Sequence, residues 1–425
     1  METYIMTGVK VTKLTKCLAC GGEHLELILD LGNQPPANSY KDTPEEVQEE
    51  FPLAINLCTD CYHVQLTDVV DPDLLYKNYL YVSGTSQTMK DHCEWFARFV
   101  TERTGAHNVL DIGCNDGTQL DAFRKLGYRT FGIDPATNLC KISGKNHTVF
   151  NGYFEDFDDK IWWYEKQGFS TIIAQNVFAH NTNPLAFLKK AKSLLPDSGL
   201  IFIQTSQADM ILNNEFDTIY HEHISFYNIN SMNELCKRAG LNLIDVVKCP
   251  LHGNSYIFVI SLPMYPSQKL YQNAHIENLI AMERKSGLYT RETYNTYAKK
   301  CQALVTDLKS RIEFYTRNEI GYLAIGYGAA AKGMTLLNYA DIKLDYIIDD
   351  NPLKQGKYTP GLGIPIVSSK MLQENCDTSL FIPLAWNFFD EISNKIIAQR
   401  KNDYDLFVKY FPRVQIIKAK EMKNE

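Results

Sequence analysis

Apolar and polar positions in the middle of the chain alternate between short apolar runs and longer amphipathic stretches. The apolar runs at 108–113, 130–134, 169–175 and 200–205 predict β-strands, and the stretches between them predict helices and polar loops. Strands that alternate with helices are typical of βαβ units, whose parallel sheet is covered by helices. The pattern therefore predicts an α/β fold for this part of the chain.

The same alternation returns near the end of the sequence. An apolar run at 322–328 leads into a turn rich in glycine and alanine, then a helix, then a strand that ends at Asp349 and Asp350. Between the two patterns, residues 268–318 are charged and carry several tyrosines, which indicates a helical bridge. We therefore expect a second α/β unit that is connected to the first one by helices.

Length and composition are typical of a globular protein with more than one domain. The 425 residues exceed what one hydrophobic core usually holds, and 45% hydrophobic with 22% charged residues is ordinary. A net charge of -7 argues against an electrostatic nucleic-acid binder but allows a small anionic ligand. We see no leader and no run near the roughly 18 to 20 apolar residues of a membrane helix, so we expect a cytoplasmic monomer.

Four cysteines near the N-terminus form two C-x-x-C pairs: Cys17 with Cys20, and Cys58 with Cys61. Two such pairs can direct four thiolates at one zinc ion, and a four-thiolate site has no open position for catalysis. Redox pairs or chance spacing are the alternatives, and His24 or His63 could replace one cysteine. The spacing favours a structural zinc site formed by the four cysteines.

A glycine turn follows the strand predicted at 108–113. Gly113 and Gly117 allow the backbone to approach a ligand closely, and Asp134 ends the next strand, where an acid can accept hydrogen bonds from a ribose diol. The turn differs from the dinucleotide-binding G-x-G-x-x-G. It resembles the D-x-G-x-x-x-G motif of class I S-adenosylmethionine methyltransferases, with Asp111 in first place. An ordinary βαβ unit with glycines for packing is the alternative.

Two further loops follow predicted strands, where ligands of open α/β sheets bind. The loop at 175–183 is expected to bring Asn176 and His180 near the methionine end of a cofactor. In the second α/β unit, the small residues around Gly328 leave room for a phosphate or nucleotide, with Lys332 available to it. Tight packing alone explains this second turn equally well.

The segment "FDTIYHEHISFY", residues 216–227, contains two histidines, a glutamate and several aromatic rings. Such residues can bind zinc, but further ligands must come from another element and none is evident nearby. A polar loop or one face of a β-strand is a second interpretation. The position of the segment after the methyltransferase-like pattern favours a third interpretation, a catalytic segment.

These parts together resemble the three-domain S-adenosylmethionine-dependent sugar C-methyltransferases, which methylate nucleotide-linked keto-deoxysugars. "CLACGGEHLELILDLGNQPPANSY" and "CTDCYHVQL" match the zinc-binding domain of that family. "DIGCNDG", "GIDPATN", "QNVFAHN" and "FDTIYHEHISFY" match its middle domain, and "GYGAAAKGMTLLN", "IIDDNPLKQGKYTPGLGIPI" and "LAWNFFDEI" match its last domain. The chain departs from the family at Gln204, where an acid is common, and at Asn254 and Ile257, near which we expect glycines and an arginine.

The resemblance implies an α/β architecture in four parts. These are a zinc-binding domain at 1–75, a Rossmann-like methyltransferase domain at 76–265, a helical linker at 266–318 and a Rossmann-like domain at 319–425 that binds the nucleotide-sugar. It also implies S-adenosyl-L-methionine and structural Zn²⁺ as cofactors. The substrate would be a nucleotide-diphosphate keto-deoxysugar, linked to thymidine or guanosine, in the biosynthesis of a branched-chain deoxysugar.

The resemblance further implies roles for individual residues. Contacts to the cofactor are expected from Asp111, Gly113, Cys114, Asn115, Gly117, Asp134, Pro135, Asn176, Val177 and His180. Contacts to the substrate are expected from His221, Tyr327, Gly328, Lys332, Asp350 and Asn351. The catalytic residues are expected to be His223, Glu222 and Tyr220, with Tyr79 and Tyr81 as tyrosines that close over the sugar. Packing at a domain boundary is the alternative for Tyr76, Tyr79 and Tyr81.

Methylation of carbon requires that a proton first leave it. The C3 proton of a 4-keto sugar lies α to the carbonyl, so a base can remove it while donors hold the oxyanion, and the enolate then attacks the methyl group in line. His223 suits the role of base because its unperturbed pKa, about 6.5, lies near neutral pH. Tyr220 would donate to the enolate oxygen, and Glu222 would orient a histidine or a sugar hydroxyl. In an extended run His221 would point away from His223, which favours a structural or cofactor-side role.

Two other functions remain compatible with these residues. Methylation of oxygen or nitrogen in a small molecule needs no carbon acid and would use the same cofactor domain. A zinc-knuckle scaffold would bind a nucleotide or the cofactor without turning over a substrate. The position of the new methyl group and the effect of His223→Ala on turnover distinguish the three hypotheses.

Overall fold

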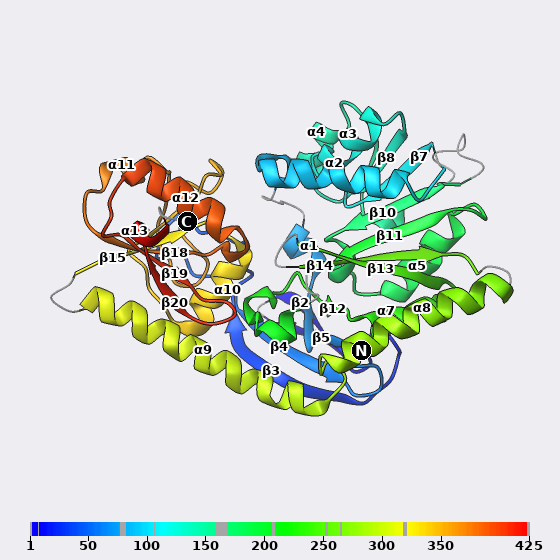
Figure 1. The fold of residues 1–425 in the computed structure, drawn as a ribbon, viewed down its shortest axis with the longest axis horizontal. Helices are drawn as coiled ribbons and strands as arrows, with labels where there is room; N and C mark the ends of the chain where they lie inside the picture. Colours follow the sequence, from blue (N-terminus) through cyan, green and yellow to red (C-terminus); the bar gives the residue numbers. More distant parts are fainter. Residues whose placement is uncertain are drawn as a thin grey trace.

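The structure is a computed structural model that describes residues 2–6, 8–76, 82–105, 107–158, 168–205, 209–250, 254–263, 266–317 and 321–422. These described residues form four β-sheets. The predicted α/β class is confirmed, with the N-terminal strands between a central and a C-terminal α/β part (Figure 1). Among the described residues, no helix combines the length and apolar composition that crossing a bilayer requires.

The N-terminal part consists of two small antiparallel sheets. One sheet orders its strands β1 (Glu2–Met6), β2 (Val9–Lys13) and β6 (Asp68–Val70). The other orders them β12 (Ser225–Phe226), β5 (Val64–Leu66), β4 (Phe51–Cys58) and β3 (Leu25–Gln34). Strand β12 belongs to the segment 216–227, so this segment is tied by backbone hydrogen bonds to the N-terminal part.

The central part contains a seven-stranded sheet. The strand order is β13 (Asn242–Cys249), β14 (Ser255–Ser261), β11 (Leu200–Thr205), β10 (Thr171–Gln175), β7 (Asn108–Ile112), β8 (Arg129–Asp134) and β9 (Thr148–Asn151). Only β14 runs antiparallel to its neighbours, β11 and β13. From β7 the chain continues to β8 and β9 on one side of the sheet and then crosses to β10 on the other side of β7. The carboxyl ends of β7 and β10 therefore flank a topological switch point.

Helices connect these strands and cover the sheet. They are α2 (Gln87–Thr101), α3 (Thr118–Lys125), α4 (Thr137–Ser143), α5 (Pro184–Ser193) and α7 (Ile229–Ala239). Local chemistry sets the ends of α7: Asn228 and Ser231 form a reciprocal capping box, and Gly240 ends the helix at φ 69°, which only glycine adopts without cost. Strand β7 is buried along its whole length, as expected for a parallel strand with helices on both faces.

The C-terminal part has a six-stranded sheet with the same logic. Its order is β17 (Ile366–Val367), β16 (Tyr346–Ile348), β15 (Leu323–Tyr327), β18 (Ser379–Pro383), β19 (Leu406–Lys409) and β20 (Gln415–Lys418). Its helices are α10 (Ala331–Ala340), α11 (Met371–Glu374), α12 (Phe389–Arg400) and α13 (Ala419–Met422). The switch point here lies between the carboxyl ends of β15 and β18.

Two long helices, α8 (Pro266–Lys285) and α9 (Arg291–Arg317), run along one side of the molecule and join the two α/β parts (Figure 1). Buried residues of α9 recur at helical spacing, at Tyr297, Cys301, Leu304 and Leu308. They share one hydrophobic core with N-terminal strands such as β3 and with the C-terminal sheet. Because each buried leucine contributes about 1.5 to 3 kcal/mol, this shared core holds the parts in a defined arrangement.

Short helices and turns form the remaining connections. They are α1 (Pro72–Tyr76), α6 (Met210–Asn213) and the 3-10 turns η1 (Ser83–Thr85), η2 (Phe154–Asp156), η4 (Phe178–His180), η5 (Phe216–Thr218) and η7 (Trp386–Phe388). Turn η4 follows β10 and turn η7 follows β18, so each lies at the switch point of its own sheet.

Candidate active site

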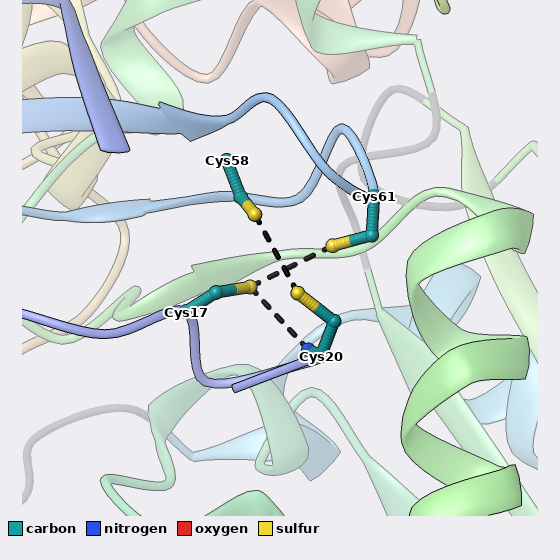
Figure 2. Close-up of side chains that lie close together, drawn as sticks. All are labelled: Cys17, Cys20, Cys58 and Cys61. Atoms are coloured by element: carbon teal, nitrogen blue, oxygen red, sulfur yellow. Dashed lines mark hydrogen bonds between the residues drawn. The ribbon is translucent and has the colours of Figure 1, made fainter. Parts of the chain in front are cut away.

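The two cysteine pairs converge on one point, as Figure 2 shows for Cys17, Cys20, Cys58 and Cys61. The four sulfur atoms all lie within 4.8 Å of one another. The Sγ atoms of Cys17 and Cys61 are 3.6 Å apart, and those of Cys20 and Cys58 are 3.5 Å apart. Four thiolates at about 2.3 Å from a tetrahedral zinc ion are separated by about 3.8 Å, so the cluster fits zinc.

Neither histidine considered as a replacement ligand belongs to this cluster. The exposed His24 pairs with Asp60 through Nδ1 and Oδ1 at 2.9 Å. The buried His63 places Nε2 3.3 Å from Ser225 Oγ, in the strand that the segment 216–227 contributes. The four cysteines therefore form the zinc site, and all four ligand positions are supplied by protein, which makes its role structural.

A cleft of about 1310 Å³ lies where the three parts of the molecule meet. It is lined from the N-terminal part by Asn38 and Tyr76, from the central part by motif residues such as Asp134, and from the C-terminal part by Gly328 and Lys332. Of the predicted catalytic, cofactor and substrate residues that the structure describes, all line the cleft except Gly117, His221 and Glu222. Tyr79 and Tyr81 lie outside the described residues.

The glycine turn after β7 forms the floor of the cofactor side. A Cβ atom on Gly113, at φ 79°, would lie 3.0 Å from the Val177 side chain, so only glycine fits this close approach. Asp134 accepts backbone N–H groups on both oxygens, from Asn115 at 2.8 Å and from Ala136 at 2.8 Å. These two bonds hold the carboxylate at the carboxyl end of β8, where a ribose diol can reach its remaining lone pairs.

Two buried polar side-chain atoms beside this turn are available to bind a ligand. Among the described residues, Asn176 Oδ1 and His180 Nε2 have no hydrogen-bond partner, although both residues line the cleft. Burial lowers the pKa of His180 to about 4, so its ring is neutral at pH 7. Because buried polar atoms are rarely left unpaired, this end of the cleft fits a polar cofactor such as S-adenosylmethionine.

The first acid of the motif has a different environment. Asp111 lies one residue before the end of β7 and is almost fully buried, and burial together with the nearby Asp134 raises the pKa of its carboxyl to about 8. A protonated Asp111 can donate a hydrogen bond as well as accept one. Gly117 caps α3 at φ 88°, where a side chain would meet Ser143 and His147. Gly117 therefore shapes the turn, while a cofactor contact from this residue stays a prediction.

Tyr220 and His223 form a hydrogen-bonded pair at the edge of the cleft. The hydroxyl of Tyr220 lies 2.8 Å from His223 Nε2, and His223 Nδ1 lies 2.9 Å from the carbonyl oxygen of Thr218. A carbonyl oxygen can only accept, so Nδ1 carries the proton and the neutral ring keeps its lone pair on Nε2. Of the conformations considered for this stretch, the extended run does not hold at residues 220–223, because His223 N donates to Tyr220 O at 2.8 Å and closes a turn.

Tyr76 and His180 complete this side of the cleft. The two rings stack at 5.7 Å with 9° between their planes, and the His180 ring lies 5.2 Å from that of His223. The Tyr76 hydroxyl donates to the carbonyl oxygen of Glu222 at 3.2 Å. The stack therefore joins the cofactor side of the cleft to the Tyr220 and His223 pair.

The side chains of Glu222 and His221 turn toward the N-terminal part. Glu222 Oε1 accepts from Asn38 Nδ2 at 2.5 Å, and His221 Nε2 lies 3.2 Å from the Phe51 carbonyl oxygen. Burial lowers the pKa of His221 to about 4, so it stays neutral. The geometry favours the structural alternative for His221, while a substrate contact from this residue stays a prediction.

The C-terminal side of the cleft repeats the arrangement of the cofactor side. Gly328, at φ 84°, begins the turn after β15, and Asp349 Oδ2 accepts from Ala329 N at 2.7 Å. Asp349 thus holds its glycine turn as Asp134 does in the central sheet. The neighbouring Asp350 instead accepts from the Tyr327 hydroxyl at 3.0 Å and from Lys395 Nζ at 2.6 Å.

An insertion between the two cysteine pairs braces this second turn. The Tyr40 hydroxyl donates to the Ala329 carbonyl oxygen at 2.6 Å, and Lys354 Nζ donates to the same oxygen at 2.7 Å. Lys354 lies over the Tyr40 ring, with 5.0 Å between Nζ and the centroid. The C-terminal side of the cleft is lined by lysines that can contact an anion, together with carboxylates: Lys332, Lys354, Lys395, Asp349, Asp350 and Glu391.

Sequence reasoning missed several residues of the cleft. Asn38, Lys354 and Asp349 were not among the expected contacts, and Tyr76 was left undecided between packing and ligand binding. The signal for Asp349 was present, because it ends a strand as Asp134 does. Nothing local marks Asn38 or Lys354, which meet the site only through long-range packing. At the departure Gln204, the side-chain oxygen lies 3.0 Å from His92 Nε2, in a polar pair beneath the cleft.

Three family models match successive parts of the chain. The model described as "Putative zinc binding domain" matches residues 17–76, "Methyltransferase domain" matches 85–246 and "C-methyltransferase C-terminal domain" matches 250–412. The C-methyltransferase NovU of Streptomyces niveus is 28% identical over 394 residues, which are 90% of this chain and 92% of that protein.

Two other similarities cover less than half of the chain. The ubiquinone biosynthesis O-methyltransferase of Coxiella burnetii is 25% identical over 162 residues, 35% of this chain and 68% of that protein. The structure of the CcbJ methyltransferase from Streptomyces caelestis shares 12% identity at a TM-score of 0.33 and covers 40% of this chain and 90% of that one. A TM-score this low has no bearing on the assignment.

The cofactor cleft, the zinc cluster and the three matched models define an S-adenosylmethionine-dependent methyltransferase that carries its own zinc-binding and C-terminal domains. The chain matches these three models in succession, and it is similar to the C-methyltransferase NovU over most of both chains. Its cofactors are S-adenosylmethionine and a structural zinc ion at the four cysteines.

Proposed function

We propose that this enzyme methylates C3 of a nucleotide-linked 4-keto-6-deoxysugar, with His223 as the base. The observation that carries the proposal is the hydrogen-bonded pair of Tyr220 and His223, which lies between the cofactor turn and the second glycine turn. The pair offers a proton acceptor and a hydroxyl donor side by side. A ketone with an acidic α-proton needs both, one at the carbon and one at the neighbouring oxygen.

The chemistry begins with the tautomer of His223. The Thr218 carbonyl keeps the proton on Nδ1, so Nε2 accepts the C3 proton of the sugar, and the C–H electron pair becomes the enolate. The new imidazolium retains its bond to Thr218, and the Tyr220 hydroxyl turns from Nε2 to the C4 oxygen, where negative charge develops. S-adenosylmethionine, when bound, supplies the electrophilic methyl group that C3 then takes up.

Other residues of the chain hold the reactants and exclude water. Tyr76 and His180 stack between the cofactor turn and the base, so they separate the reacting atoms from solvent on that side. The carbonyl of Glu222 is held by Tyr76, and its carboxylate by Asn38. Glu222 is therefore assigned an orienting role for the loop of the base. Tyr79 and Tyr81 stay predicted contacts to the sugar.

The nucleotide part of the substrate is assigned to residues 319–425. The turn at Gly328 lies at the switch point between β15 and β18, and the cleft continues along Asn351 and Lys332. Lysines that face this turn suit a diphosphate, and Asp349 suits a ribose as Asp134 does on the cofactor side. Thymidine and guanosine diphosphates are the proposed carriers. The cytoplasmic location and the monomeric state stay predictions from the sequence.

The test is turnover with a panel of nucleotide-linked keto sugars. The enzyme should transfer one methyl group to carbon and should exchange the C3 proton with heavy water in the presence of S-adenosylhomocysteine. A new methyl group on oxygen or nitrogen would contradict the proposal and favour a small-molecule O- or N-methyltransferase. Cofactor binding with a turnover that does not respond to His223→Ala would favour a scaffold.

A further inference from the structure

A buried hydrogen bond links the turn that precedes the base to the C-terminal part. Trp386 Nε1 donates to Asp217 Oδ2 at 2.9 Å, across the boundary between the two α/β parts. Asp217 has no exposed surface, and it belongs to η5, three residues before Tyr220. The neighbouring Phe216 packs edge-on against Tyr339 and Phe411 of the same C-terminal part.

This bond is an unusual use of a buried carboxylate. Among the described residues, Asp217 Oδ1 has no hydrogen-bond partner, and burial raises the pKa of the carboxyl to about 7. Lys332 acts in the opposite direction on that pKa and places Nζ 4.9 Å from the centre of the Trp386 ring. A buried carboxyl group with one hydrogen-bond partner lowers the stability of the fold, which indicates a functional role for the bond.

Both ends of the bond touch functional parts of the cleft. On one side, Asp217 is followed by Thr218, whose carbonyl fixes the proton of His223 on Nδ1. On the other side, Trp386 stands in the loop after β18, between Ala385 and Asn387, which line the cleft at the C-terminal switch point. The cleft is thus connected to the base through the loop at Trp386, the hydrogen bond to Asp217 and the turn η5.

We infer that the Trp386–Asp217 hydrogen bond positions the Thr218 carbonyl oxygen. Through this bond, a ligand at the C-terminal side of the cleft influences which ring nitrogen of His223 carries the proton. Asp217 and Trp386 are positioning residues that act through His223. The inference rests on the proposed function for the identity of the occupant. The arrangement of the base by this bond is a property of the protein alone and is measurable without substrate.

The direct test uses ring-nitrogen magnetic resonance of the protein labelled with ¹⁵N-histidine, with His223 assigned by the signal lost in His223→Ala. Wild-type protein should show His223 protonated on Nδ1. Trp386→Phe removes the donor and keeps an aromatic ring, and Asp217→Ala removes the acceptor. Both should give a mixed tautomer, whereas Asp217→Asn keeps an acceptor oxygen and should restore the wild-type signal.

Phe411→Leu is the matched control, because Phe411 contacts both Phe216 and Trp386 without taking part in the bond. It should leave the His223 signal unchanged. An unchanged signal in Trp386→Phe, or an equal change in Phe411→Leu, would overturn the inference. Folding of each variant is checked by its zinc content and its affinity for the cofactor.

A kinetic measurement separates this inference from the proposed function. If a keto sugar is turned over, Trp386→Phe should lower kcat about tenfold, the scale of one hydrogen bond to a charged group, with KM for the cofactor unchanged. A KM change without a kcat change would contradict the coupling. If no sugar in the panel is turned over, the proposed function fails, while the resonance experiment still decides whether the bond sets the tautomer.

Discussion

The hydroxyl of Tyr220 lies 2.8 Å from Nε2 of His223, while the opposite ring nitrogen faces the carbonyl of Thr218 at 2.9 Å. This relationship gives the two residues distinct roles before any substrate arrives. The carbonyl determines that Nε2 is the basic atom, and the hydroxyl occupies the place beside it where an oxyanion donor is needed. The segment 216–227 therefore holds a proton acceptor and a hydroxyl donor side by side.

Replacement of the base should abolish methyl transfer and spare the cofactor. We expect His223→Ala to lower kcat by at least about a hundredfold, the lower end of what a general base contributes, with little change in S-adenosylmethionine affinity. Turnover measured by mass spectrometry and affinity measured by calorimetry decide this. His275→Ala, which removes a surface histidine paired with Asp245, is the control and should behave as wild type. Equal turnover in His223→Ala would contradict the assignment.

The two strand-end acids should divide their effects between the two halves of the cleft. Asp134→Asn is expected to weaken S-adenosylmethionine binding by about tenfold to a hundredfold, because a charged acceptor is lost, and to leave nucleotide binding nearly unchanged. Asp349→Asn should do the reverse with thymidine or guanosine diphosphate. Calorimetry with each ligand measures both effects. Loss of cofactor affinity in both variants would indicate one shared site instead.

Loss of one zinc ligand should unfold the N-terminal part. Cys58→Ser is expected to bind much less than one zinc ion per chain and to have a lower thermal midpoint, because the metal contributes folding free energy directly. Cys376→Ser is the matched control, since this cysteine is exposed and outside the cluster. Zinc content by atomic emission and unfolding by calorimetry check the prediction. Full zinc content in Cys58→Ser would refute a four-cysteine site.

Buried neutral histidines should make the fold sensitive to acid. Burial lowers the pKa of His221 and of His180 to about 4, below the usual value near 6.5. Their contribution to stability is therefore complete above pH 6.5 and is lost as the pH falls through 4, because only the unfolded chain takes up the protons.

The measurement is the free energy of unfolding in urea at several values between pH 7.5 and 4.5. His221→Gln removes one proton of uptake, so its decline toward acid should be flatter than that of wild type, by up to about 1.4 kcal/mol per pH unit. His107→Gln changes an exposed histidine and should keep the wild-type slope. A wild-type slope in His221→Gln would show that this residue is not buried in neutral form.

Periodicity and motif spacing predicted the parts of this fold that depend on local chemistry. These parts owe their geometry to neighbouring residues in the chain. They are strand β7 with the glycine turn that follows it, the acid Asp134 and the two cysteine pairs. For the segment 216–227, the sequence left a β-strand face, a polar loop and a catalytic segment open, and the catalytic role stays a prediction. Alternation suggested an extended run, whereas the turn at Tyr220 is imposed by contacts with N-terminal and C-terminal residues.

The residues that sequence reasoning missed reach the cleft from a distance along the chain. Asn38 contacts a glutamate 184 positions later, and Trp386 contacts an aspartate 169 positions earlier. No local pattern encodes such pairs, because they depend on how three separate cores pack together. Asp349 is different, since its equivalence to Asp134 follows from the repeated strand, turn and helix.

The most direct test of the account is proton exchange at C3 of thymidine- and guanosine-linked 4-keto-6-deoxysugars in heavy water, followed by magnetic resonance with S-adenosylhomocysteine bound. Wild-type enzyme should exchange that proton, and with S-adenosylmethionine it should place one methyl group on the same carbon. His223→Ala should do neither while still binding the cofactor. Absence of both exchange and C-methylation across the panel with wild-type enzyme would contradict the account.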